Sequence, residues 1–207
     1  MNIPLTLELT AVGVCAITGV LAAEGKQVDL FGVLVLAVVT AFGGGTVRDL
    51  LLGDLPVVWM RDARYLLTAV LTGLGTFLVV RYRPLPRTVL LVADAFGLAL
   101  FTLVGVQKGL AYGVTAPVGV MLGVITGVAG GIFRDVLTGT IPLVFRPAIY
   151  LYATAALCGA VVYVLVLRWF AAETPAAISG ATTTLVLRLA AIRWKLGLPL
   201  FQVRRQE

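Results

Sequence analysis

Two Arg-Asp dipeptides, Arg48-Asp49 and Arg134-Asp135, each lie inside a long apolar stretch. They belong to a repeat: GGTVRDLLLGDLPVVW begins at position 44, and GGIFRDVLTGTIPLVF begins at position 130. Each position of the second copy therefore follows its counterpart by 86 residues, which is 130 minus 44. An acid beside a base within lipid is costly unless both are paired inside protein or line a polar cavity. The repeat therefore indicates an ionic structure or a polar route at membrane depth.

The partners of these charged residues follow from helix geometry. Adjacent residues on a helix point about 100° apart, so neither pair is expected to close on itself. We expect Arg48 to reach Asp135 and Arg134 to reach Asp49, across the two repeats. The four residues would then be a buried clasp that holds the halves together, or the lining of a permeation path. Because arginine repels cations, a cation path would also need compensating acids or carbonyl groups.

Glycine clusters precede both dipeptides: Gly43, Gly44 and Gly45, then Gly130 and Gly131. Residues 30–42 would form only about 20 Å of helix, too short to span, so these glycines fall within the membrane. They either allow another helix to approach closely, or mark a kink or break whose backbone faces a watery path. Their recurrence directly before a charged pair favours the kink.

Two further intramembrane charges are secondary candidates for the site. Asp94 is expected about one turn into a helix, where an acid suits the helix N-terminus or a pore mouth. Arg188 lies among leucines, and we interpret it as a snorkelling or paired structural residue.

Composition excludes several classes of protein. Hydrophobic residues make up 60% of the 207 positions and the mean hydropathy is +1.04, which is typical of an integral membrane protein. The chain has no histidine, and no metal-ligand cluster or nucleophile-base pair is recognisable, so we expect no enzyme, no metal site and no cofactor. The net charge of +6 sits in short loops and the tail, which suits an anionic bilayer and not nucleic acid.

Hydropathy predicts seven transmembrane helices, and so an all-α membrane protein. They cover roughly residues 5–23, 30–52, 64–80, 89–106, 115–137, 148–167 and 175–194. Three crossings per repeat is an odd number, so the second repeat enters from the opposite side as an inverted repeat. We expect a first repeat at 1–86, an inverted second repeat at 87–172, and a seventh helix with a basic tail at 173–207.

The loop charges predict the orientation. We call side A the side on which the chain begins, and side B the opposite one. Basic residues concentrate on side B: Lys26, Arg81, Arg83, Arg87, Arg146, Arg193, Lys195, Arg204 and Arg205. The positive-inside rule then places side B and the C-terminus in the cytoplasm, with the N-terminus outside.

The doubled motif, in a chain of this length with seven spans, resembles the prokaryotic TRIC (trimeric intracellular cation) channels. These form the bacterial family with tandem "glycine transporter" domains. The resemblance implies a homotrimer in the cell membrane, in contact with lipid, with a pore in each protomer that conducts monovalent cations, chiefly K⁺. It also implies that Gly43 to Gly45, Gly130 and Gly131 kink the second and fifth spans beside the pore. Ala129 stands where the first repeat has Gly43, so the second kink is expected to be milder.

Two functions remain open at this point. Broken helices around intramembrane charge favour a passive K⁺ channel. Inverted repeats with broken helices are also typical of secondary transporters, and Arg-Asp pairs could hold a small zwitterion such as glycine.

Overall fold

The computed structural model of the chain describes residues 4–83, 85–146 and 151–196. Within these ranges the elements are α1 (Leu5–Ala22), α2 (Leu30–Leu52), α3 (Val58–Arg61), α4 (Ala63–Tyr82), α5 (Arg87–Ala111), α6 (Ala116–Leu137), the 3-10 helix η1 (Leu143–Phe145), α7 (Tyr152–Phe170) and α8 (Glu173–Trp194). The seven longest are long and apolar enough to cross a membrane. The prediction of an all-α protein with seven spans is therefore confirmed.

The two repeated helices begin and end where local sequence dictates. At the start of α2, the Asp29 carboxylate accepts a hydrogen bond from the Gly32 amide at 2.8 Å. Past their C-terminal ends, Gly53 and Gly139 adopt φ of +68° and +66°, which other residues reach only with strain. These glycines hold equivalent positions in the two repeats, so the repeated sequence ends both helices in the same way.

Two predicted spans differ from the observed helices by three or more residues at an end, and the others by two at most. The fourth was expected over 89–106, but α5 runs from Arg87 to Ala111. The polar run Gln107-Lys108-Gly109 therefore continues the helix, which places Lys108 on α5 and not in a loop. Of the sixth expected span, positions 148–150 lie outside the described residues, and the observed helix α7 ends at Phe170.

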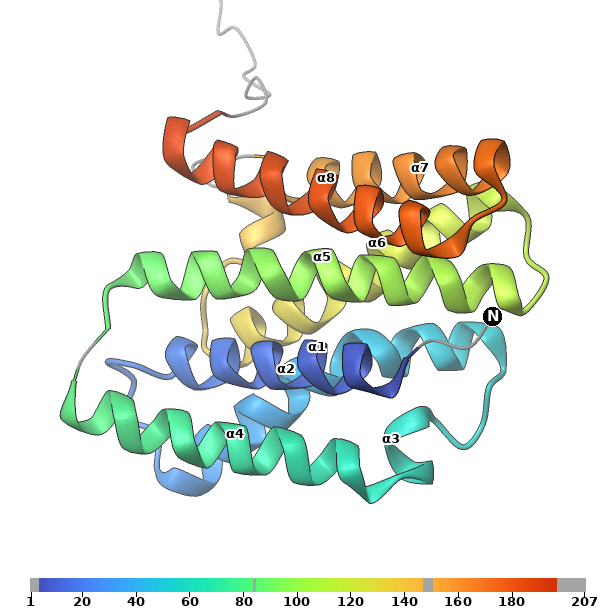
Figure 1. Ribbon diagram of the computed structural model, residues 1–207. Helices are drawn as coiled ribbons and strands as arrows, with labels where there is room; N and C mark the ends of the chain where they lie inside the picture. The colour runs from blue at the N-terminus through green and yellow to red at the C-terminus, as the bar shows by residue number, and fades with distance from the viewer. Residues whose placement is uncertain (1–3, 84, 147–150, 197–207) are drawn as a thin grey trace, which may run out of the picture.

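The chain is an inverted repeat of three spans (Figure 1). In Figure 1, α1 and α4 run in one direction and α2 in the other, whereas α5 and α7 run against α1 and α4, and α6 runs against α2. Each span of the first repeat is therefore antiparallel to its counterpart in the second. Helix α8 lies beside α7, outside this pairing.

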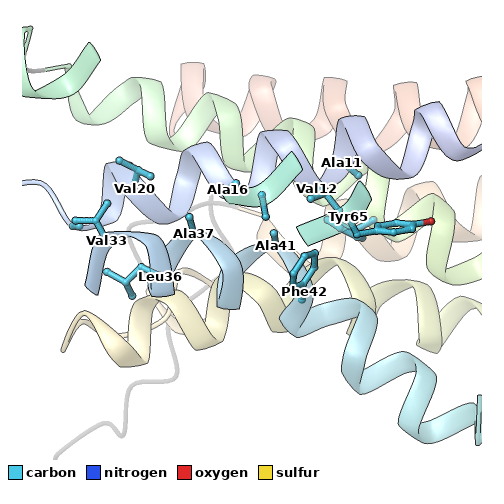
Figure 2. Packing of buried hydrophobic residues seen from close by; sticks show 13 residues of the cluster. Ala11, Val12, Ala16, Val20, Val33, Leu36, Ala37, Ala41, Phe42 and Tyr65 are labelled. Atoms are coloured by element: carbon cyan, nitrogen blue, oxygen red, sulfur yellow. The ribbon is translucent and has the colours of Figure 1, made fainter. Parts of the chain in front are cut away.

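Each repeat supplies most of the residues of one hydrophobic core, and Phe101 of α5 joins the core of the first repeat. Alanine and valine side chains of α1 and α2 pack with Phe42 and with Tyr65 of α4, as Figure 2 shows. In the second repeat, α5, α6 and α7 pack around Leu98, Val128 and Tyr152. The many alanines let these helices approach closely, as is typical where lipid removes the hydrophobic drive for association.

The glycine clusters do not interrupt their helices. Both α2 and α6 are continuous α-helices across Gly43–Gly45 and Gly130–Gly131. Figure 2 shows the axis of α2 changing direction beside Phe42, directly before the glycines. Of the two predicted forms, a kink or a break, α2 therefore adopts the kink.

Candidate functional site

The two repeated helices cross at their glycines. A β-carbon on Gly44 would overlap the carbonyl oxygen of Thr126, and one on Gly130 would overlap the carbonyl oxygen of Thr40. Thr40 and Thr126 are themselves equivalent, and their hydroxyls donate to Leu36 O at 2.5 Å and Leu122 O at 2.6 Å. The crossing is thus symmetric about a pseudo-two-fold axis. At these two glycines the close approach of helices, the alternative left open by the sequence, is what the structure contains.

The glycine that follows each crossing point faces an arginine. A β-carbon on Gly45 would lie 3.8 Å from Arg48 Nη2, whereas one on Gly131 would lie 2.9 Å from the Tyr152 hydroxyl and 3.6 Å from Arg134 Nη2. A β-carbon on Gly43 would instead lie 2.5 Å from Cδ2 of Phe133. Of the five glycines in the two clusters, only Gly45 has space for a methyl group in ordinary contact.

Each Arg-Asp dipeptide closes on itself, which corrects the expected pairing across the repeats. Arg48 Nε donates to Asp49 Oδ1 at 2.8 Å, and Arg134 Nε donates to Asp135 Oδ1 at 2.8 Å. All four residues are buried. The crossing lies four residues before each arginine, and the antiparallel helices carry each pair about 6 Å from it in opposite directions. The pairs consequently lie toward opposite faces of the membrane.

The second oxygen of each aspartate holds the segment after its helix. Asp49 Oδ2 accepts from the Val58 amide at 3.0 Å, and Asp135 Oδ2 accepts from the Leu143 amide at 2.8 Å. These amides begin α3 and η1, the short helices that follow α2 and α6. The repeated dipeptide therefore fixes the chain reversal at the end of each repeated helix.

Lys108, which lies beyond the end of the predicted fourth span, joins the two repeats. Lys108 Nζ on α5 lies 2.7 Å from Asp49 Oδ1 and 2.6 Å from Asp54 Oδ2, and Asp54 also binds Arg61. We call Asp49, Asp54, Arg61 and Lys108 the Lys108 cluster. The cluster is an ionic clasp between the halves, as one interpretation of the dipeptides proposed, but the clasp is made by Lys108 and not by the arginines.

The hydrogen bonds of the cluster keep Asp54 ionised. Burial raises the pKa of this carboxyl, but hydrogen bonds from Lys108, Tyr112 and Arg61 outweigh it and hold the pKa well below its usual range. Asp54 lies in the loop after α2 on side A. The signal that could have revealed this cluster is Asp54, the only acid that the first repeated segment has and the second lacks, since Thr140 replaces it.

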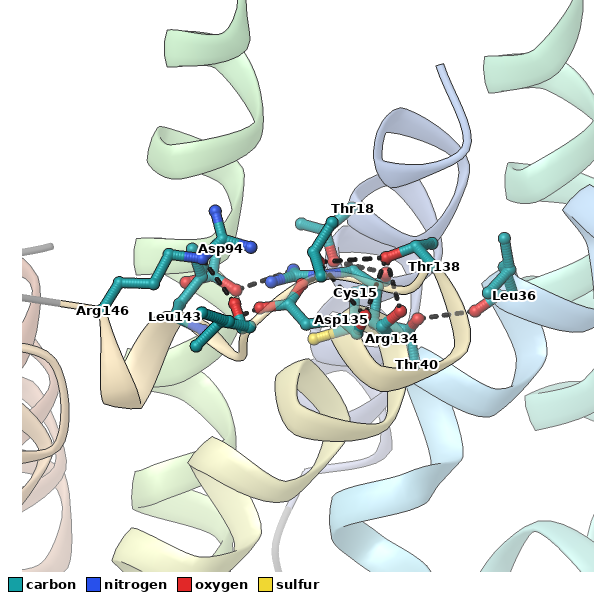
Figure 3. Close-up of polar contacts among 12 residues, drawn as sticks. Cys15, Thr18, Leu36, Thr40, Asp94, Arg134, Asp135, Thr138, Leu143 and Arg146 are labelled. Carbon is teal, nitrogen blue, oxygen red and sulfur yellow. Dashed lines mark hydrogen bonds and ion pairs between the residues drawn. The ribbon is translucent and has the colours of Figure 1, made fainter. Parts of the chain in front are cut away.

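The equivalent place in the second repeat is open. A cavity of about 440 Å³ on side B reaches Asp135, and its lining includes Ala22, Lys26, Arg87, Thr138, Thr140 and Arg146. We call it the Asp135 cavity. Ala22 is the counterpart of Lys108, so a methyl group stands here at the position that carries an ammonium in the second repeat. Figure 3 shows Asp135, Thr138 and Arg146 of this cavity together with Arg134 and Asp94. Beside Arg48, by contrast, a cavity of only about 20 Å³ has room for about one water.

The secondary candidates Asp94 and Arg188 lie close to Arg134. Arg134 Nη1 donates to Asp94 Oδ1 at 2.8 Å, and the Tyr152 hydroxyl donates to the same oxygen at 3.3 Å (Figure 3 shows the acid and the arginine). Arg188 is fully buried, with its Cζ 4.8 Å from the centre of the Tyr152 ring. Asp94 is the eighth residue of α5. It is therefore not a helix-terminal acid, and Arg188 does not snorkel.

The first repeat has a counterpart to the Asp94 contact. Glu8, which is equivalent to Asp94, accepts a hydrogen bond from Tyr65. Arg48 also lies on the small cavity that Glu8 lines. Each arginine is thus accompanied by acids, two for Arg134 and one direct partner for Arg48, so its charge is compensated.

The sequence is similar throughout its length to bacterial membrane proteins. The family model described as glycine transporter matches residues 5–81 and again residues 91–168. The UPF0126 inner membrane protein YadS of Escherichia coli strain K12 is 46% identical over 198 residues, covering 94% of each chain. A UPF0126 membrane protein of Vibrio cholerae serotype O1 is 44% identical over 201 residues, covering 96% of this chain and 83% of the relative. The chain is a multi-pass membrane protein.

Solved structures show the same fold. A TRIC trimeric intracellular cation channel orthologue from Rhodobacter sphaeroides superposes with a TM-score of 0.87 at 35% identity, covering 92% of this chain and 97% of that one. A structure from work on conductance through TRIC cation channels gives 0.85 at 35% identity, covering 99% and 100%. These relatives are named as channels or membrane proteins, in agreement with the prediction that the chain is not an enzyme. The chain therefore belongs to the prokaryotic TRIC channel family, the family with tandem glycine transporter domains.

Proposed function

We propose that the chain is a cation channel that conducts monovalent cations, chiefly K⁺, through a pore within each protomer of a homotrimer. The observation that carries this proposal is the similarity to TRIC cation channel structures, at a TM-score of 0.87 over 92% of the chain. The two matches to the family model support a division into repeats at 1–86 and 87–172, followed by 173–207. The basic loops support an N-terminus outside the cell and a C-terminus in the cytoplasm.

The geometry fits a route for cations along the α2–α6 crossing. Charged residues lie at both ends of the crossing, and at each end the arginine is neutralised by at least one acid within 2.8 Å. Neutralised guanidinium groups oppose a passing cation less than free ones. The Asp135 cavity lies at one end of this route and is large enough to hold several waters.

The function is tested by single-channel recording of the purified protein in planar bilayers. A channel gives stepwise currents with a reversal potential that follows the K⁺ gradient. Saturable uptake of glycine into liposomes, with no stepwise current, would instead establish the transporter that the sequence left open. The rates differ by orders of magnitude, because a carrier must change conformation for each molecule it moves.

The same recordings decide what the arginines do. If Arg48 and Arg134 line the pore, Arg48→Ala and Arg134→Ala change conductance, rectification or selectivity. If conductance, rectification and selectivity all stay at the wild-type values in correctly folded variants, the arginines are structural. Circular dichroism of the same samples checks the folding.

A further inference from the structure

We propose that the Asp135 cavity binds a phosphate-bearing anion at its basic rim. The cavity holds about 440 Å³, which is ample for a phosphate group with part of a larger molecule. Its lining brings together three basic side chains from separate elements: Lys26 from the loop after α1, Arg87 from the first position of α5, and Arg146 from the segment after η1. The proposal does not depend on the chain being a channel.

The charges around the cavity are unbalanced. Its two acids are Glu24 and Asp135, and Asp135 already binds Arg134 at 2.8 Å and the Leu143 amide at 2.8 Å. Across residues 4–83, 85–146 and 151–196, Lys26 and Arg87 take part in none of the recorded ion pairs. The rim therefore carries positive charge that a dianionic phosphate would neutralise.

The donors at the rim have free capacity. Arg146 Nε donates to the carbonyl of Ile141, which leaves the two terminal nitrogens of the guanidinium for a ligand. Helix α5 begins at the cavity, and Pro86 before it provides no side-chain cap. Its first amides and its positive dipole end consequently add to the attraction for an anion.

The floor of the cavity excludes deeper binding of an anion. The hydroxyl of Thr138 donates to the carbonyls of Arg134 and Asp135 at 3.0 Å, and that of Thr140 donates to Asp135 O at 3.1 Å. The oxygens of Asp135, Thr138 and Thr140 at this floor therefore act as acceptors toward a ligand. An anion is held at the rim, at the level of the lipid headgroups, where basic pockets between spans bind phosphates.

The phosphate that two arginines and a lysine would bind could belong to a lipid headgroup or to a soluble molecule. The full-length protein in neutral detergent is titrated by calorimetry, at constant ionic strength, with inorganic phosphate and with short-chain phosphatidylglycerol. Short-chain phosphatidylcholine serves as the zwitterionic reference. Binding of phosphatidylglycerol alone identifies a lipid site, and binding of inorganic phosphate identifies a site for soluble phosphates.

Variants connect the binding to the cavity. Arg87→Gln and Arg146→Gln each remove charge from the rim, and each is expected to weaken binding about tenfold, the loss of one charge-assisted hydrogen bond. Arg83→Gln is the matched control, since Arg83 is exposed at the end of α4 on the same side of the membrane and does not line the cavity. The proposal is overturned if neither ligand binds, or if Arg83→Gln weakens binding as much as Arg146→Gln.

Discussion

The two ends of the α2–α6 crossing carry the same Arg-Asp dipeptide in different surroundings. At the side A end, the Lys108 ammonium lies on Asp49, and the neighbouring cavity holds about 20 Å³. At the side B end, Asp135 lies on a cavity of about 440 Å³. The repeated motif sets the internal geometry of each pair, whereas the unrepeated residues Lys108 and Ala22 decide how much space lies beside it.

This difference also divides the electrostatic roles. Arg134 forms ion pairs with two acids, Asp135 and Asp94. Asp49, by contrast, forms ion pairs with two bases, Arg48 and Lys108. Removing equivalent arginines therefore leaves unequal amounts of uncompensated charge.

Removal of Arg134 should lower the stability of the protein more than any other change considered below. Arg134→Met leaves two buried carboxylates without their base, and we expect it to lower the free energy of unfolding by about 3–5 kcal/mol. Arg48→Met should cost clearly less, because Lys108 still neutralises Asp49. Thermal unfolding in mild detergent compares the two variants. Equal losses would show that the two ends are energetically alike.

The next effect concerns the crossing, which both ends share. Gly44→Ala and Gly130→Ala each press a methyl group into a backbone carbonyl of the facing helix. We expect each to lower the free energy of unfolding by about 1–3 kcal/mol. The control is Gly45→Ala, whose methyl group would meet only Arg48 Nη2 at 3.8 Å. If Gly45→Ala unfolds at the same temperature as Gly44→Ala, the crossing is not the reason for the glycines.

Copying the lysine into the open end should make the two ends more alike. Ala22→Lys places an ammonium next to Asp135 and Thr140, as Lys108 lies next to Asp49 and Asp54. An added charge about 4 Å from a passing K⁺ costs it about 1 kcal/mol, so single-channel conductance should fall about fivefold. Ala22→Met fills the same space without adding charge, so it separates the electrostatic part of the fall in conductance from the steric part. An Ala22→Lys channel that conducts as well as the wild type would argue against a route through this cavity.

The smallest effect is the pH dependence of the Lys108 cluster. The Asp54 pKa lies below its unfolded value of about 3.9, so its stabilisation is present above that pH and is lost as the pH falls further. At pH 7 the wild type should have a higher melting temperature than Asp54→Asn. This difference in melting temperature should shrink below about pH 4. Asp62→Asn, in an exposed pair with Arg64, should show little gap at either pH. A gap unchanged at pH 3 would contradict the role of Asp54.

The fold was predictable because span length and the odd number of spans per repeat are properties of the sequence pattern itself. The position of the glycines at depth was predictable for the same reason. The partners of Arg48 and Arg134 could not be predicted in this way, because the prediction assumed that the two dipeptides meet where the helices cross. The crossing instead lies at Gly44 and Gly130, one turn earlier, so the pairs move apart.

Other parts of the site depended on how far a helix extends. Lys108 was assigned to a loop because a Gln-Lys-Gly run is polar, yet its contacts with Asp49 and Asp54 allow α5 to continue to Ala111. The earlier start of α5, at Arg87, likewise moved Asp94 from the end of a helix into the interior. Such compensation between distant segments has no local sequence signal.

Passage of ions through the Asp135 cavity is tested by blocking the cavity. Ala22→Cys, made in a Cys15→Ala, Cys158→Ala background, is recorded in a planar bilayer while a cationic methanethiosulfonate is added from side B. We expect the K⁺ current to fall step by step as Cys-bearing channels are modified, and the background protein to be unaffected. Undiminished current through fully labelled channels would contradict it.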